Sequence, residues 1–436
     1  MSTYTISTKE GIEYRYDISK GQIINQSSGL PINISPDILG FRKKKEGKLL
    51  RILLGTKCNY DCSYCSQAFS RTDSVEVSPK AINDFLEKTK DILTDIYRIE
   101  FWGGEPLVYI KYLYLLVPEL RKRFPDALFT MVSNGSLLTD DIGDFLAENR
   151  VLFTISHDAY AHKITRGKDI LESPEHLECI KRTYAKINKV MAEYLQLPKV
   201  NFCGFNLVYT KHCLDPIRVQ EWFNSKLGEY VAVSCDPVMG MGNGAENSSL
   251  DFSLEDLKNL AANTFKAGMQ EPNTYPYTIA EDGMRFIRDL YANTKVIDAS
   301  SLCGIAEGRS VVVDLLGNLY PCQNFVQQHH VRGNIYLEGF TKPITTNFKD
   351  SKYCTNCPVV MLCRGGCPLS EGNGFVKTCN AKFWYKLGIF ASAFKRITGH
   401  TPTKLKGNIV RPLLEAIPTS EGKSIQLTEV DIPQYE

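Results

Sequence analysis

The sequence predicts an α/β protein in which a partial, TIM-like (β/α)6 barrel precedes a smaller cysteine-rich domain. Between residues 49 and 250, six short apolar segments alternate with segments of helical periodicity, which is typical of parallel strands joined by helices. Six such units are two fewer than a closed barrel contains, so we expect the sheet to stay open. Seven of the 14 cysteines then gather between residues 303 and 379.

The first 48 residues contain a predicted β-hairpin that turns at residues 19–21. Helices follow the strands of the barrel, and their expected starts lie near Pro79, Thr139 and residue 216. In such barrels the chemistry takes place at the C-terminal ends of the strands. The strands are expected at residues 49–56, 97–102, 127–133, 151–156, 200–209 and 229–234.

After the sixth strand, a Gly-rich loop covers residues 236–251, and a capping box at Ser253 opens a helical region that continues to about residue 293. The residues from Leu405 onward show no clear periodicity and are expected to be extended or mobile. We therefore divide the chain into an N-terminal β-hairpin extension (1–48), the partial barrel (49–250), a helical linker (251–300), the cysteine-rich domain (301–385) and a C-terminal helix and tail (386–436).

The composition restricts the possible partners. The chain has 51 Lys and Arg against 49 Asp and Glu, so its charge gives no reason to expect nucleic acid or an anionic membrane as a partner. No apolar run approaches the ~18 residues of a membrane span, and the first residues lack the apolar core of a signal peptide. We therefore expect a cytoplasmic protein, in which 14 cysteines indicate metal binding or redox chemistry rather than disulfides.

Three cysteines lie close together in one loop. The stretch GTKCNYDCSYCSQ (55–67) follows the first barrel strand and contains Cys58, Cys62 and Cys65. A structural zinc site needs four ligands, and no histidine lies near this loop in the sequence. A [4Fe–4S] cluster with three cysteine ligands leaves one iron open to a small molecule, and we favour this interpretation. Four further cysteines are scattered and are expected to be buried apolar residues: Cys179, Cys203, Cys213 and Cys235.

The spacing CxxxCxxC, with Tyr64 directly before the last cysteine, resembles that of the radical S-adenosylmethionine (SAM) superfamily. In that family the amino and carboxylate groups of SAM chelate the fourth iron. The segment FWGGEP (101–106) follows the second strand, as the GGE motif of the family does. The resemblance implies that Gly103 and Gly104 let the backbone approach the ligand and that Glu105 accepts a hydrogen bond from the SAM ammonium group.

The resemblance also implies contacts from later strand ends. Ser156 and Arg166 would contact the ribose and carboxylate of SAM, while Tyr64 and Leu207 would contact its adenine. Ordinary turn and strand-cap roles are the alternative for several of these residues. The full set of implied SAM-binding residues is Tyr64, Gly103, Gly104, Glu105, Ser133, Asn134, Ser156, Arg166 and Leu207.

The seven later cysteines resemble the SPASM domain, a C-terminal extension of radical SAM enzymes that binds two auxiliary iron–sulfur clusters. Together with the SAM cluster, the resemblance therefore implies three [4Fe–4S] clusters. A pair of zinc sites is the alternative that CxxC spacing alone favours. Following the ligation pattern of the family, the outer cluster would have four ligands: Cys354, Cys357, Cys363 and Cys379. The inner cluster would have three: Cys303, Cys322 and Cys367.

The inner group has one cysteine fewer than in some relatives, because no cysteine precedes Cys303 where they have one. The inner cluster therefore has either an open iron or a fourth ligand such as Asp298 or an outside group. An open iron next to the barrel would be able to bind a substrate sulfur or amide.

The resemblance implies an enzyme that cleaves SAM to a 5′-deoxyadenosyl radical and abstracts hydrogen from a peptide or small-protein substrate. The electrons would come from an external donor of the flavodoxin or ferredoxin type. We favour a crosslink in a ribosomally synthesised peptide as the product. The first alternative is a formylglycine-generating enzyme of the anaerobic sulfatase-maturase type. A zinc-scaffold or electron-transfer binding module is an alternative from another class.

One position bears on the choice between the two enzymes. Sulfatase maturases have an aspartate after the second SPASM cysteine, and it serves as the base. Here Gln323 occupies that position, and an amide cannot act as a base. We therefore assign no catalytic residue from the sequence.

Overall fold

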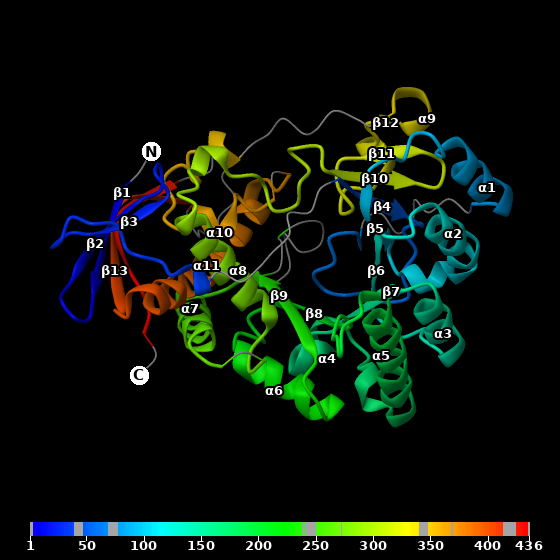
Figure 1. The fold of residues 1–436 in the computed structure, drawn as a ribbon, viewed down its shortest axis with the longest axis horizontal. Helices are drawn as coiled ribbons and strands as arrows, with labels where there is room; N and C mark the ends of the chain where they lie inside the picture. Colours follow the sequence, from blue (N-terminus) through cyan, green and yellow to red (C-terminus); the bar gives the residue numbers. More distant parts are fainter. Residues whose placement is uncertain are drawn as a thin grey trace.

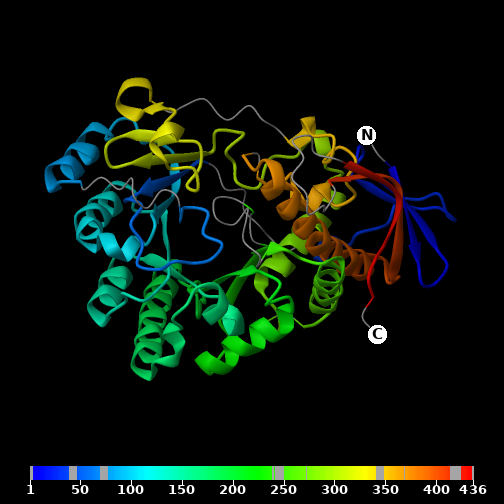
Figure 2. The ribbon, with the colours of Figure 1, turned by 180° about the vertical axis from the view of Figure 1, so that it is seen from behind.

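The structure is a computed structural model that describes residues 3–38, 47–68, 77–237, 240, 250–271, 273–339, 348–367, 369–412 and 424–434. Two separate sheets organise this part of the chain, and a layer of helices lies between them (Figures 1 and 2). Both chain ends lie at the smaller sheet, whereas the residues implied in SAM binding lie on strands of the larger sheet or in the segments that follow them.

The larger sheet consists of β4 (Lys48–Leu53), β5 (Ile96–Trp102), β6 (Leu128–Ser133), β7 (Val151–Ser156), β8 (Gly204–Tyr209), β9 (Ala232–Pro237), β10 (Ser310–Asp314), β11 (Asn318–Tyr320) and β12 (Gly333–Asn334). The order of these strands in the sheet is β12-β11-β10-β4-β5-β6-β7-β8-β9. From β4 to β9 each strand pairs in parallel with the next, so the six predicted parallel strands are confirmed. Their C-terminal ends meet along one edge of the sheet.

Three strands differ from their predicted bounds by at least three residues, and the first of them, β4, ends at Leu53 instead of residue 56. β8 begins at Gly204 instead of residue 200, and β9 covers residues 232–237 instead of 229–234. The bounds of β8 and β9 follow from their parallel pairing, in which Gly204 pairs with Ala232 and Tyr209 with Pro237. Asp236, which we expected in a loop, therefore lies at the end of a strand. Most of the predicted Gly-rich loop beyond it lies outside the described residues.

The sheet also includes strands from the region that we assigned to a separate domain. β10 pairs in parallel with β4, and β11 and β12 continue from it in antiparallel pairs. Arg51 on β4 links its two neighbours, since Nε donates to Glu100 Oε2 on β5 (2.5 Å) and Nη1 donates to Ser310 Oγ on β10. The cysteine-rich region is thus built onto the edge of the parallel sheet.

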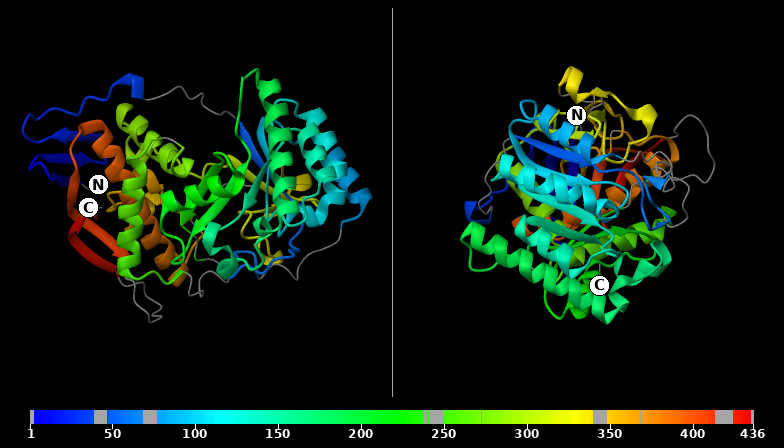
Figure 3. Two further views of the ribbon diagram at one scale, coloured as in Figure 1. Left: turned by 90° about the horizontal axis from the view of Figure 1, so that it is seen from below. Right: turned by 90° about the vertical axis from the view of Figure 1, so that its right-hand side faces the viewer.

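The connecting helices are α1 (Pro79–Lys88), α2 (Ile110–Arg123), α3 (Asp140–Glu148), α5 (Pro174–Leu195) and α6 (Pro216–Leu227). Ser78, Thr139 and Ser173 each accept a hydrogen bond from a backbone N–H in the first turn of α1, α3 and α5, which explains where these helices begin. Figures 1 and 3 show α1, α2, α3 and α5 together on one face of the sheet. The loops that form the site lie at the C-terminal ends of the strands.

The smaller sheet has the order β14-β13-β1-β2-β3 and consists of β1 (Thr3–Thr8), β2 (Glu13–Asp17), β3 (Gln22–Asn25), β13 (Pro402–Pro412) and β14 (Ser424–Asp431). The predicted hairpin is confirmed, since β2 and β3 pair in antiparallel fashion around residues 18–21. We expected an extended or mobile C-terminal tail, and its described part is extended: β13 lies between β1 and β14 and buries Leu405 and Ile409. Residues 413–423 of the tail lie outside the described residues.

Three helices fill the space between the sheets: α7 (Leu254–Gly268), α8 (Tyr277–Tyr291) and α11 (Gly372–Thr398). The predicted capping box of α7 is confirmed, because Ser253 and Asp256 exchange hydrogen bonds. α11 contains 27 residues and crosses the boundary that we predicted at residue 385. None of the described helices combines the length and apolar character needed to cross a membrane.

The remaining short elements lie in loops. They are η1 (Pro36–Ile38), η3 (Pro106–Tyr109), η4 (Ala159–Ala161), α4 (His162–Thr165), η5 (Ile170–Glu172), η8 (Val296–Asp298), η9 (Gln328–His330), α9 (Ile335–Glu338), η10 (Phe348–Asp350) and α10 (Val360–Cys363).

The close packing of α11 on α7 gives a test of the fold. A Cβ at Gly388 would collide with the carbonyl oxygen of Ala261 and would lie 2.8 Å from the Cβ of Thr264. We therefore expect Gly388→Ala to lower the free energy of unfolding by ~1–3 kcal/mol, because the helices must move apart. Gly283→Ala in α8 is the matched control, since its Cβ would meet only Cγ2 of Ile389 at 3.8 Å. That variant should gain ~0.5–1 kcal/mol. Equal melting temperatures for the two variants would contradict the packing.

Candidate active site

A cavity of about 320 Å³ lies at the C-terminal ends of the parallel strands, between the loop after β4 and the ends of β5 to β8. Pockets of ~300–1,000 Å³ are typical for cofactors and small ligands. The structure brings eight of the nine residues implied in SAM binding to this cavity: Tyr64, Gly103, Gly104, Glu105, Ser133, Asn134, Ser156 and Arg166.

Leu207 is the ninth residue, and the structure does not place it at the cavity. Its side chain is fully buried in the core, while its neighbours Asn206 and Val208 line the cavity. Side chains alternate along a strand, so residues 206 and 208 share one face of β8 and Leu207 belongs to the other. The expected contact between Leu207 and the adenine of SAM is therefore not supported.

The loop that follows β4 packs directly against the loop that follows β5. The backbone N–H of Gly104 donates to the carbonyl of Gly55 (3.0 Å), and that of Glu105 donates to Lys57 (2.9 Å). A Cβ on Gly103 would lie 2.7 Å from the carbonyl oxygen of Gly55. Glycine at these positions is needed for the two loop backbones to meet, in addition to any approach of a ligand.

Cys58, Cys62 and Cys65 are half-buried, and all three line the cavity. Burial raises the pKa of Cys62 to about 11, although Arg166 opposes this shift. Nη1 of Arg166 lies 3.8 Å from Sγ of Cys62. Three thiols at the wall of one cavity fit an iron–sulfur cluster with three protein ligands, and they would release their protons when iron binds.

Glu105 joins the ends of two strands. It is 1% exposed and caps η3, where Oε1 accepts a hydrogen bond from the backbone N–H of Leu107 (2.9 Å). Its two oxygens also accept from Oγ of Ser133 (2.6 Å) and from the backbone N–H of Asn134 (2.7 Å). Burial raises the pKa of Glu105, and these hydrogen bonds oppose the rise. The carboxylate therefore holds the ends of β5 and β6 together beside the cavity.

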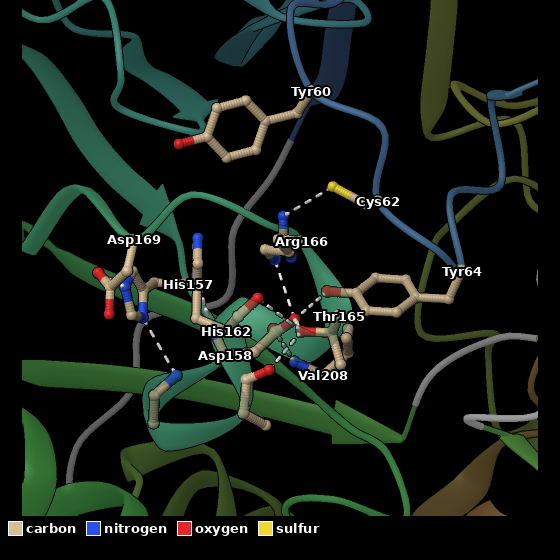
Figure 4. A network of polar contacts seen from close by, with 12 residues as sticks. Tyr60, Cys62, Tyr64, His157, Asp158, His162, Thr165, Arg166, Asp169 and Val208 are labelled. Atoms are coloured by element: carbon tan, nitrogen blue, oxygen red, sulfur yellow. Dashed lines mark hydrogen bonds and ion pairs between the residues drawn. The ribbon is translucent and has the colours of Figure 1, made fainter.

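Asp158, which we did not assign from the sequence, organises the polar network shown in Figure 4. Its Oδ2 accepts hydrogen bonds from Oη of Tyr64 (2.5 Å), Oγ1 of Thr165 (2.7 Å) and Nε of Arg166 (3.0 Å). Burial alone would raise the pKa of Asp158, but Arg166 and the two hydroxyl groups lower it below its usual value. Asp158 follows β7 directly, and an acidic residue at the C-terminal end of a strand was the signal that could have revealed it.

Two stacked histidines support the same loop (Figure 4). The ring centroids of His157 and His162 lie 3.8 Å apart, and Nε2 of His157 lies 2.8 Å from Oδ1 of Asp169. Burial lowers the pKa of His162 to about 4 and also lowers that of His157. Both rings are therefore neutral at neutral pH, which fits a packing role.

The C-terminal region closes one side of the cavity. Gln323 and Asn324 are among its lining residues, and Nε2 of Gln67 donates to the carbonyl of Gln323 (2.5 Å). The thiol of Cys322 donates to Oε1 of Gln323 (3.3 Å). A single glutamine thus contacts a ligand of the implied inner cluster and lies at the 320 Å³ cavity.

The structure brings the C-terminal cysteines together in two neighbouring groups. Burial, with contributions from Cys367 and Cys303, raises the pKa of Cys322 to about 12, so these three implied inner ligands interact electrostatically. A second cavity, of about 30 Å³, is lined by Cys367 and by all four implied outer ligands: Cys354, Cys357, Cys363 and Cys379.

All 14 cysteines are free thiols, and the four scattered ones are buried, as predicted. Within the described ranges, no three His, Cys, Asp or Glu side chains are arranged to hold a single metal ion.

The network around Asp158 gives a second test. We expect Asp158→Asn to lower the free energy of unfolding by ~3–5 kcal/mol at pH 7, because the buried Arg166 loses its counter-charge. The pKa of Asp158 is lower in the folded than in the unfolded chain. Its stabilising effect is therefore present above pH ~4 and is lost as the pH falls through the folded-state pKa.

The measurement is thermal unfolding of wild type and variant at pH 7 and at several pH values below 4, where the difference should shrink. Thr165→Val is the control, because it removes one hydrogen bond to the same carboxylate without changing the charge. It should cost only ~1 kcal/mol. Equal losses in the two variants at pH 7 would show that the Asp158–Arg166 ion pair does not contribute to stability.

Comparisons with known proteins agree with this geometry. The model of the Radical SAM superfamily matches residues 52–206, which begin in β4 and end in β8. The chain is 21% identical to the radical SAM cyclopropyl synthase TigE of Paramaledivibacter caminithermalis, over 73% of this chain and 67% of that protein. It is 23% identical to the serine-type anaerobic sulfatase-maturating enzyme of Bacteroides thetaiotaomicron, over 76% of this chain and 83% of that protein.

A solved structure supports the same fold. Native anSMEcpe with bound AdoMet superposes with a TM-score of 0.55 at 18% sequence identity, covering 80% of this chain and 98% of that chain. The matched region contains the three-cysteine loop, the GGE segment and the Asp158 network that together form the cavity. Residues 52–206 thus match the Radical SAM superfamily, and the chain is similar to radical SAM enzymes over most of its length.

Proposed function

We propose that this chain is a SPASM-type radical SAM enzyme that binds a [4Fe–4S] cluster and SAM at the 320 Å³ cavity and modifies a peptide. The observation that carries the proposal is that three half-buried thiols and a set of buried polar side chains meet at one cavity, at the C-terminal ends of parallel strands. When bound, the cluster and SAM supply the one-electron chemistry that removes hydrogen from an unactivated C–H bond.

Glu105 is suited to receive the ammonium group of SAM. A carboxylate offers about four acceptor positions, and the protein uses three of them, through Leu107, Ser133 and Asn134. One position therefore remains for a ligand at the cavity. We propose that Ser133 and Asn134 act mainly by positioning Glu105, since their own hydrogen bonds are made within the protein.

Arg166 and Tyr64 form the opposite wall in the proposal. Asp158 orients both side chains, and the guanidinium of Arg166 lies 5.3 Å from the centre of the Tyr64 ring. The Nη1 atom of Arg166 points towards Cys62 (Figure 4), and Arg166 is the proposed contact of the SAM carboxylate. Ser156, at the end of β7, is the proposed ribose contact, and the ring of Tyr64 is the proposed adenine contact.

Two auxiliary clusters complete the proposed set of three [4Fe–4S] clusters. The shared cavity of the four outer cysteines supports the outer cluster, and the proximity of Cys303, Cys322 and Cys367 supports the inner one. Since the inner group has three cysteines, we propose an open iron or a fourth ligand such as Asp298 or an outside group. An external flavodoxin- or ferredoxin-type protein would supply electrons in the cytoplasm.

We propose a peptide substrate and prefer a crosslink in a ribosomally synthesised peptide as the product. A peptide is bound in one structure of anSMEcpe, and the relatives include both a cyclopropyl synthase and sulfatase-maturating enzymes. Gln323 favours the crosslink over formylglycine formation. It places a neutral amide at the cavity beside Cys322, in the sequence position where sulfatase maturases have their base. Sulfatase maturation remains the second candidate.

The cluster assignment is tested by changing Cys58, Cys62 and Cys65 together to alanine. This variant should form no 5′-deoxyadenosine from SAM under anaerobic reducing conditions, because it has lost every protein ligand of the SAM cluster. It should keep the iron bound by the C-terminal cysteines. Iron, sulfide and zinc per chain are measured alongside, with Cys179→Ala as a control that changes only a core thiol. SAM cleavage by the triple variant, or a colourless zinc protein, would refute the assignment.

The substrate is tested by mass spectrometry. The enzyme is co-expressed with small peptides encoded beside its gene and, separately, with a sulfatase-derived peptide that contains the Cys or Ser to be oxidised. We expect a crosslink in a neighbouring peptide and no formylglycine in the sulfatase peptide. Formylglycine in the second experiment would reverse the order of the two candidates, and the variant Gln323→Asp measures how far this position decides between them.

A further inference from the structure

The guanidinium of Arg411 is buried next to the outer cysteine group. Arg411 lies near the end of β13, is 5% exposed and lines the second cavity. Its Nη2 lies 3.2 Å from Sγ of Cys379 and donates to the carbonyl of Cys379 (2.8 Å), while Nη1 lies 3.7 Å from Sγ of Cys357. The ring of Phe383 covers the cation at 4.1 Å. One fork-shaped side chain therefore spans two of the four outer thiols.

Arg411 differs from two other buried cations, Arg364 and Lys382, because each of these two forms an ion pair with a carboxylate. Arg364 pairs with Asp289 (2.5 Å), and Lys382, which also lies near the outer thiols, pairs with Asp236 (2.8 Å). In the described part of the chain, Arg411 has no carboxylate within ion-pair distance, and its Nε has no hydrogen-bond partner. Burial would lower the pKa of Arg411, but the thiols of Cys379, Cys357 and Cys363 raise it.

An uncompensated buried guanidinium is costly, so its position requires an anion nearby. Four thiolates around an iron–sulfur core provide one, since their summed negative charge exceeds the positive charge of the core. The position of Arg411 is therefore explained when the outer site is loaded.

The backbone of β13 contacts the same loops independently of the Arg411 side chain. The N–H of Val410 donates to the carbonyl of Asn356, between Cys354 and Cys357 in the sequence (3.2 Å). The side chain of Asn380 donates from Nδ2 to the carbonyl of Pro412 (3.2 Å). Three consecutive residues, 410–412, thus contact the segments that contain Cys357 and Cys379.

We infer that the end of β13 forms one wall of the outer auxiliary site and that Arg411 is a positioning residue that donates hydrogen bonds to the Cys379 and Cys357 thiolates. The inference rests on the proposed function, because it takes the four outer cysteines as cluster ligands. Hydrogen bonds and positive charge at cluster sulfurs stabilise the reduced state, which has one more negative charge. Arg411 therefore raises the reduction potential of the outer cluster.

The test is an anaerobic redox titration followed by EPR, in a chain in which Cys58, Cys62 and Cys65 are alanine, so that only auxiliary clusters contribute. Arg411→Met removes the charge and both hydrogen bonds, and it should move one of the two midpoints to a lower potential. Arg411→Lys keeps the charge but cannot bridge two thiolates, so its shift should be smaller. Lys406→Met is the matched control, because Lys406 lies on the same strand, is half-exposed and pairs with Glu13 at the surface. It should leave both midpoints unchanged.

Iron and sulfide per chain are measured for each variant, because Arg411→Met has a second possible outcome. Loss of one cluster's iron in Arg411→Met, with retention in Arg411→Lys and Lys406→Met, also supports the inference. Full iron content with midpoints equal to those of the parent chain in both Arg411 variants would overturn it. Absence of auxiliary iron in the parent chain itself would overturn the proposed cluster assignment, and with it this inference.

Discussion

Strand β4 is paired in parallel on both of its edges, and the arrangement of the cavity depends on this pairing. On one side, β5 leads to the GGE segment, whose backbone then bonds to the loop that follows β4. On the other side, β10 leads through β11 to Cys322 and Gln323, and Gln67 bonds to the latter. The three-cysteine loop therefore begins between two fixed neighbours. A loop attached to an edge strand would have only one, and its thiols would not be held at the same cavity as Gln323.

Buried charge is the second constraint on the site. The polar groups at the cavity are paired within the protein before any ligand arrives: Asp158 with Arg166, and Glu105 with three hydrogen-bond donors. Such pairing avoids the cost of isolated buried charges and fixes the side chains in one orientation. Around the outer cysteines the same rule holds for Lys382, which pairs with Asp236, but among the described residues no carboxylate pairs with Arg411.

The sequence was informative wherever the signal is local. Apolar periodicity located the six parallel strands, and thiol spacing located both cysteine groups, because each depends on residues close together in the chain. Pairing between distant segments left no such trace, so the parallel contact of β10 with β4 and the insertion of β13 beside β1 were missed. For Leu207 the strand was predicted correctly, but the side of the strand that faces the cavity was not. Residues 206 and 208 line the cavity instead. Asp158 was missed because an acid after a strand looks the same whether it caps a turn or organises a site.

The sharing of one sheet by the two ends of the chain affects the order of events during biosynthesis. β1 is made before the parallel strands of the larger sheet, whereas its neighbour β13 is made after them. Domains generally fold as they emerge, from the N-terminal side, so the parallel strands β4 to β9 are able to pair while β1 still lacks its partner. The cavity of the outer cysteines is likewise without Arg411 until β13 arrives. A growing chain thus presents these thiols without one wall until β13 has been made.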